Sequence, residues 1–118
     1  PGIEPEESEV KLGGGPSLSL FDARMIPNLR LRDLVIDTAR ELGIPLQFSA
    51  MIGGSTDGAQ IHLHRTGVPS VVLGVPARHI HSYAAIIHRE DYERALQLLT
   101  AVVEKLDAER VTGLVLQA

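Results

Sequence analysis

Hydrophobic and polar residues alternate along two short stretches of the chain, and the apolar spacing between them is helical. Residues 17–21 (SLSLF) and 46–50 (LQFSA) alternate as strands with one buried face do. Between them, mostly apolar side chains recur three and four residues apart, at Leu31, Leu34, Val35, Thr38, Ala39 and Leu42. This spacing predicts a helix that begins after an Asn28 cap and ends at Gly43.

The second half contains an apolar segment and another helical stripe. Residues 68–75 (VPSVVLGV) lack alternation, which is typical of a strand covered on both faces, so we expect a central parallel strand there. Residues 84–88 are a candidate strand and residues 59–65 a candidate short helix. A helix is predicted over residues 92–106, with an apolar stripe made of Ala95, Leu98, Leu99, Val102, Val103 and Leu106. Strands alternating with helices favour an α/β fold in three layers, α/β/α.

Composition narrows the class of protein. The 118 residues are enough for one domain, and the net charge of −4 comes without a basic stripe, which argues against nucleic acid as a partner. The sequence has no cysteine, so it has no disulfide framework and no thiolate metal site, which fits a cytoplasmic protein. No apolar run approaches the roughly 20 residues that cross a bilayer, so we expect no membrane association.

The first residues do not resemble a folded element. Residues 1–16 contain three prolines, four glutamates and three consecutive glycines, and they predict an extended lead-in. Gly13, Gly14 and Gly15 are interpreted as a linker, because a phosphate-cradling loop requires a preceding strand and a following helix. Glu6 and Glu7 could suggest a general base, but a solvated acidic segment explains them better. The opening residues suggest the interior of a longer protein.

Histidines and a polar turn are the candidate sources of chemistry. His79 and His81 follow the apolar segment and, two residues apart in an extended segment, point the same way, so they could share a metal; the alternative is hydrogen-bonded loop histidines. Thr56 and Asp57 lie in a glycine-rich turn at a predicted helix start, where they could face a ligand or merely cap the helix. The histidines on that helix, His62 and His64, face different directions and are interpreted as structural.

Six segments occur in series and carry a resemblance that none carries alone: residues 12–16 (LGGGP), 22–28 (DARMIPN), 53–57 (GGSTD), 61–63 (IHL), 67–70 (GVPS) and 75–82 (VPARHIHS). This series resembles the C-terminal part of the cytoplasmic glutamyl/deblocking aminopeptidases. That family is known for tetrahedral dodecamers, and some of its members have been labelled endoglucanases. The likeness runs from about residue 12 to residue 107.

The resemblance implies that residues 17–118 are the C-terminal part of an α/β/α metallopeptidase catalytic domain with a mixed sheet. It implies peptide substrates and two divalent metal ions, zinc or cobalt. His81 matches a metal ligand of the family, whereas His79 stands where the family more often has Tyr, which leaves its role open. Thr56 and Asp57 match a segment near the active site and are predicted to line the substrate pocket. The remaining ligands and the catalytic base match nothing here, so we expect no catalytic residue in this chain and no activity from it alone.

Two other functions stay open. A non-catalytic binding or assembly module fits the absence of most ligands. A glycoside hydrolase would need two carboxylates about 5–10 Å apart, and the chain has candidates for them, but no Trp and only two Tyr make a poor sugar-binding platform. The candidate carboxylates are Asp22, Asp33, Asp37 and Asp57. If part of a larger domain is missing, the chain should expose an apolar surface or an open sheet edge and self-associate.

Overall fold

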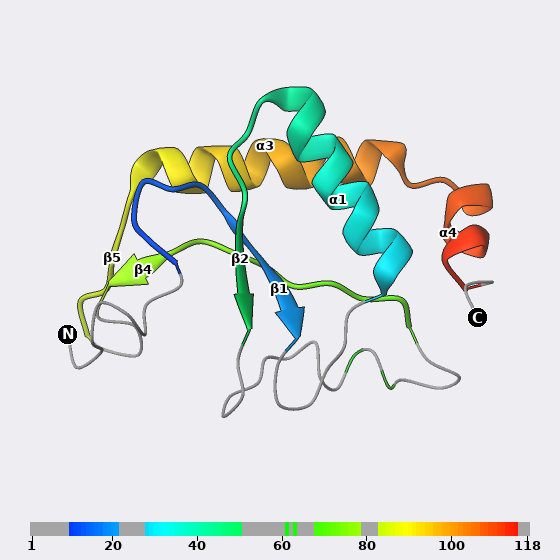
Figure 1. The fold of residues 1–118 in the computed structure, drawn as a ribbon, viewed down its shortest axis with the longest axis horizontal. Coiled ribbons are helices and arrows are strands. Elements are labelled where there is room, and N and C mark those ends of the chain that lie inside the picture. The colour runs from blue at the N-terminus through cyan, green and yellow to red at the C-terminus, as the bar shows by residue number, and fades with distance from the viewer. Residues whose placement is uncertain are drawn as a thin grey trace.

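The computed structural model describes residues 10–21, 28–50, 61, 63, 68–78 and 83–115. Figure 1 shows the two longest helices against the strands, with α3 along the long axis of the molecule. The elements are β1 (Ser17–Phe21), α1 (Leu29–Leu42), β2 (Gln47–Ala50), β3 (Leu73–Gly74), β4 (Ala77–Arg78), β5 (Ile86–Ile87), α3 (Arg89–Lys105) and α4 (Ala108–Val115). This mixture of strands and helices confirms the α/β class. Among the described residues, no helix is long and apolar enough to cross a membrane.

The principal sheet is mixed, as predicted. Its strand order is β2-β1-β3, with β1 parallel to β2 and antiparallel to β3. The parallel pair aligns Leu18 with Phe48, and the antiparallel pair aligns Leu18 with Leu73. Helix α1 makes the crossover that two sequential parallel strands require. Strands β4 and β5 form a separate antiparallel pair.

The prediction of a central parallel strand over residues 68–75 is wrong. Only β3 forms in this segment; it runs antiparallel to β1 and is the outer strand of the described sheet. The ladder is extended by one hydrogen bond, from the Ser19 amide to the Val72 carbonyl at 3.0 Å. Pro69 and Pro76 bracket the segment and cannot donate to a ladder, which limits the length of the strand. An apolar run predicts a strand with both of its faces covered by other elements, but it does not predict whether the strand is parallel or antiparallel to its neighbour.

Helix α1 begins and ends where its capping residues predict. The Asn28 side chain accepts a hydrogen bond from the Leu31 amide at 2.9 Å, and Gly43 adopts the left-handed conformation, with φ at 69°. Thr38 of this helix is buried, and its hydroxyl is satisfied by two hydrogen bonds. It donates to the Leu34 carbonyl at 2.7 Å and accepts from Lys105 of α3 at 3.0 Å.

Helix α3 starts three residues before its predicted start. Its cap is His88, whose Nδ1 accepts from the Glu90 amide at 3.2 Å, and histidine is not among the residues that usually signal a helix start. The predicted stripe is only half buried, because Leu99 and Val103 are exposed. Helix α4 was not predicted at all.

Among the described residues, a cluster of buried side chains joins the sheet to both long helices: Leu18, Val35, Ala39, Ile44, Leu98 and Val102. Leu18 is completely buried, so the face of β1 that it occupies is the covered face. Helices α1 and α3 therefore form one layer on the same side of the sheet. A second helical layer, as the α/β/α arrangement requires, is not among the described residues.

Candidate functional site

The predicted site residues lie outside the described part of the chain. This holds for Thr56, Asp57, His79 and His81, and also for His62 and His64. The structure does describe the strands that flank them. Strands β1 and β2 are parallel neighbours, and Phe21 pairs with Ala50 at their carboxyl ends. The two strands therefore end at the same edge of the sheet, and in open α/β folds this is the edge where ligands usually bind.

His81 belongs to the segment bracketed by the β4–β5 pair. Ala77 pairs with Ile87 and Arg78 with Ile86, so residues 79–85 connect two hydrogen-bonded strands. Strand β3 is antiparallel to β1 and places Gly74 beside Ser17, at the amino end of β1. The strand of the principal sheet that precedes the His81 segment, β3, therefore ends beside the amino end of β1. The strand that precedes the Thr56 segment, β2, ends beside the carboxyl end of β1. A site shared by the two segments stays a prediction.

The glycine-rich turn before β1 is a fixed structural element and not the linker that the sequence predicted. Asp91, in the first turn of α3, has no exposed surface and uses both carboxylate oxygens on this turn. Its Oδ2 accepts from the Gly13 amide at 2.8 Å and its Oδ1 from the Gly15 amide at 2.9 Å. Charge-assisted bonds of this kind are among the stronger hydrogen bonds in proteins.

Gln47 of β2 holds the same turn from the other side. Its Nε2 donates to the carbonyls of Lys11 and Gly15, at 2.8 and 3.0 Å, and its Oε1 accepts from the Lys11 amide at 2.9 Å. Glycine is required at Gly15, where φ is 98° and an added Cβ would lie 2.0 Å from the Pro45 carbonyl oxygen. The three consecutive glycines were the sequence signal for this close packing.

Asp91 and Gln47 together form a clamp on the glycine turn. It ties the amino end of α3 to the start of β2, and β5 ends one residue before the His88 cap. No group of three or more His, Cys, Asp or Glu side chains within the described ranges could hold a metal ion. His88, which is described, uses its Nδ1 as the helix cap.

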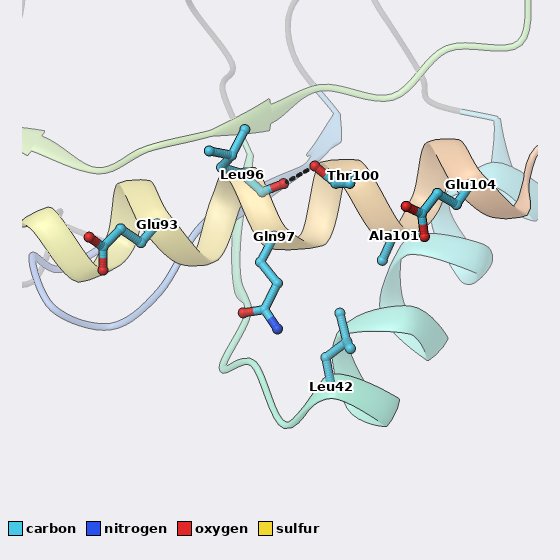
Figure 2. A pocket seen from close by; sticks show the side chains of 7 residues that line it. All are labelled: Leu42, Glu93, Leu96, Gln97, Thr100, Ala101 and Glu104. Atoms are coloured by element: carbon cyan, nitrogen blue, oxygen red, sulfur yellow. Dashed lines mark hydrogen bonds between the residues drawn. The ribbon is translucent and has the colours of Figure 1, made fainter.

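A shallow hollow between α3 and Leu42, at the C-terminal end of α1, does not have the geometry of a hydrolytic site (Figure 2). Its volume is about 400 Å³, and its polar side chains follow one ridge of the helix, Glu93, Gln97, Thr100 and Glu104. The two carboxylates are eleven residues apart along the helix, about 16 Å, which exceeds the spacing that glycoside hydrolysis needs. The Thr100 hydroxyl donates to the Leu96 carbonyl at 2.8 Å.

The described elements define an α/β protein, and comparison with known families identifies the family to which it belongs. The chain belongs to the peptidase M42 family, because the profile described as M42 glutamyl aminopeptidase matches residues 1–98. This confirms the resemblance found in the sequence.

Individual relatives agree with this assignment. FrvX of Escherichia coli K12, named as an aminopeptidase, is 40% identical over 96% of this chain and 32% of its own length. The glutamyl aminopeptidase of Lactococcus lactis is 36% identical over 86% of this chain and 28% of its own length. The chain therefore spans about a third of the length of the relatives it matches.

Solved structures match the fold as well. The TET aminopeptidase of the marine sediment archaeon Thaumarchaeota archaeon SCGC AB-539-E09 superposes with a TM-score of 0.90, at 46% identity, over 97% of this chain and 32% of that one. The TET1 peptidase of Pyrococcus horikoshii, described as assembling into a tetrahedron or an octahedral shell, gives 0.74 at 29% identity, over 88% and 30% of the two chains.

Proposed function

We propose that this chain supplies the C-terminal part of the catalytic domain of a metal-dependent aminopeptidase that releases N-terminal residues from peptides. The observation that carries the proposal is family membership: the M42 profile covers residues 1–98, and the relatives named as aminopeptidases align over most of the chain. Because the chain spans only about a third of those relatives, we also propose that it is inactive alone.

His81 is the proposed metal ligand, in a site for two divalent ions, zinc or cobalt. Imidazole suits such ions, so the chemistry of the donor fits. A catalytic site needs several ligands and an open position, so one histidine is a partial set and the others would come from elsewhere in a longer protein. When bound, the metal pair supplies an activated water and polarises the scissile carbonyl. In this proposal the chain contributes the His81 imidazole from the segment that connects the paired strands β4 and β5.

Thr56 and Asp57 are proposed to line the substrate pocket. Their segment follows the carboxyl end of β2, directly beside the carboxyl end of β1, and this position supports the assignment. Polar side chains there can orient the peptide terminus by hydrogen bonding.

Assembly and location are part of the same proposal. The P. horikoshii TET1 relatives are described as dodecameric, tetrahedral or octahedral assemblies, which supports a homo-oligomeric parent, and we propose the tetrahedral dodecamer. We place the protein in the cytoplasm, in keeping with a sequence without cysteine.

The decisive experiment is metal analysis of the full-length protein. His81→Ala should lose one metal equivalent and nearly all turnover of Leu- or Glu-nitroanilide, while the matched variant His79→Tyr should keep both. The reverse pattern would reject the ligand assignment. In a parallel assay, the 118-residue chain with zinc or cobalt should give no more turnover than its own His81→Ala variant.

A glycoside hydrolase is the second candidate, since the Thermotoga maritima protein named as an endoglucanase superposes with a TM-score of 0.60 at 30% identity, over 87% of this chain and 32% of that one. Hydrolysis of cellulose oligomers by the full-length protein, without turnover of nitroanilides, would favour this candidate.

A further inference from the structure

Asp91 is buried to a degree that the start of a helix does not require. Acidic side chains in a first helical turn stabilise the helix while they remain in water, and Glu90 does so here, with its side chain 62% exposed. Asp91 is the next residue and has no exposed surface. Moving a carboxylate out of water costs free energy unless hydrogen bonds replace the lost hydration, so the reason for its burial lies in its partners.

Those partners join the start of α3 to the turn that precedes β1. The two carboxylate oxygens of Asp91 accept from the Gly13 amide at 2.8 Å and from the Gly15 amide at 2.9 Å. The imidazole of His88, which caps the same helix, lies against the turn: a Cβ on Gly13 would be 3.6 Å from its Cδ2 atom. Two side chains at the start of α3 therefore fix the helix relative to the glycine turn.

Both strands of the β4–β5 pair leave from this region. Strand β5 ends at the residue before His88, so its end is held together with the start of α3. Strand β4 begins three residues after Gly74, and Gly74 pairs with Ser17 in the ladder between β3 and β1. A Cβ on Gly74 would lie only 3.1 Å from the Ser17 hydroxyl oxygen, so this approach is close. In Figure 1 the β4–β5 pair, the start of α3 and the blue segment that leads into β1 lie at the same end of the molecule.

We propose that Asp91 is a positioning residue for the His81 imidazole. Residues 79–85 connect β4 and β5, so the place of a metal ligand in this connection depends on where the two strands stand. The ladder with β1 holds the β4 side, and Asp91 holds the β5 side through α3. A ligand has to be held within about 0.5 Å of its working position, which makes this support important for metal affinity. This assignment rests on the proposed function, in which His81 is the ligand.

A contribution to stability alone is the competing explanation, and the choice of variants separates the two. Asp91→Asn, in the full-length protein, keeps the size of the side chain but places an NH₂ group against one of the two amides. Asp91→Glu keeps both acceptors and lengthens the side chain, which displaces α3 from the turn; it takes the place of Asp91→Asn if that variant does not fold. Val35→Ala is the control, because Val35 is a buried residue of α1 that takes no part in the clamp.

Two readouts are compared well below the melting temperature of each protein. The first is zinc affinity, measured by competition with a chelator. The second is hydrogen exchange of the metal-free protein over residues 77–88, which reports local opening of the β4–β5 pair. Asp91→Asn should weaken zinc binding about tenfold at the site that His81→Ala abolishes, and it should speed exchange over residues 77–88. Val35→Ala should lower the melting temperature and leave both readouts unchanged.

Zinc affinity and exchange that change no more in Asp91→Asn than in Val35→Ala would overturn the proposal and leave Asp91 a residue of stability alone. Faster exchange with unchanged zinc affinity would overturn it too, because the ligand would then not depend on the clamp. His81→Ala shows which proposal has failed. If His81→Ala loses one metal equivalent while Asp91→Asn binds zinc normally, only the positioning role is wrong. If His81→Ala keeps both equivalents, the ligand assignment in the proposed function is wrong, and the positioning role falls with it.

Discussion

Replacing Asp91 by alanine should be the most destabilising single change in the clamp around the glycine turn. The carboxylate is completely buried and is the acceptor for two backbone amides, those of Gly13 and Gly15, at 2.8 and 2.9 Å. The partners are more than seventy residues apart in sequence, so the loss would separate the turn from the amino end of α3. Asp91→Asn keeps the size of the side chain but removes one of the two acceptors, and it should cost about half as much.

The magnitude follows from the amides left behind. A buried amide without an acceptor costs about 1–3 kcal/mol; the Gly15 amide is buried and the Gly13 amide is partly so. Together they predict a loss of about 3 kcal/mol from a domain stability on the order of 5–15 kcal/mol. For 118 residues the unfolding entropy is about 0.25 kcal/mol per kelvin, so Tm should fall by about 12 °C.

Urea unfolding monitored by circular dichroism measures this loss, and hydrogen exchange at Gly13 and Gly15 localises it. Glu90→Ala is the matched control, because it removes an acidic residue from the same first turn of α3. Its only described ion pair is with Arg94 at 3.6 Å, and the side chain is 62% exposed, so it should change stability by less than about 0.5 kcal/mol. If Asp91→Ala destabilises no more than Glu90→Ala does, the clamp is not a source of stability and the reasoning fails.

Two further substitutions test the local geometry. Gly15→Ala should destabilise the fold by more than about 2 kcal/mol in a urea titration, because φ is 98° and the new Cβ would meet the Pro45 carbonyl. Gly113→Ala is the control. This glycine lies in helix α4 with open space around it, so the substitution should be neutral or slightly stabilising in the same titration. Asn28→Ala should lose about 1–2 kcal/mol, because Asn28 both caps α1 and donates to the Leu114 carbonyl at 3.2 Å; a melting temperature unchanged from the parent chain would contradict this dual role.

The sequence by itself determined the elements whose signals are local. Helix α1 has its cap, its apolar spacing and its terminal Gly43 within sixteen residues, so its bounds could be predicted. Strand β1 alternates polar and apolar residues, and its Leu18 packs in the buried cluster with the helices, whereas Phe48 of β2 is 41% exposed. The ordered motifs identified the family, since short segments in series are a property of the sequence alone.

Only the tertiary structure decided what depends on distant partners. The antiparallel direction of strand β3 is set by its pairing with β1, more than fifty residues earlier in the chain. The apolar pattern of the segment is the same for a parallel and an antiparallel strand, so it could not predict this direction. Gly13 and Gly15 resemble a linker in sequence; they become a fixed turn through Asp91, which reaches them from the other end of the chain. The apolar stripe predicted on α3 is buried only in part. Whether an apolar side chain is covered depends on which elements lie beside it, and in the described structure nothing lies over Leu99 and Val103.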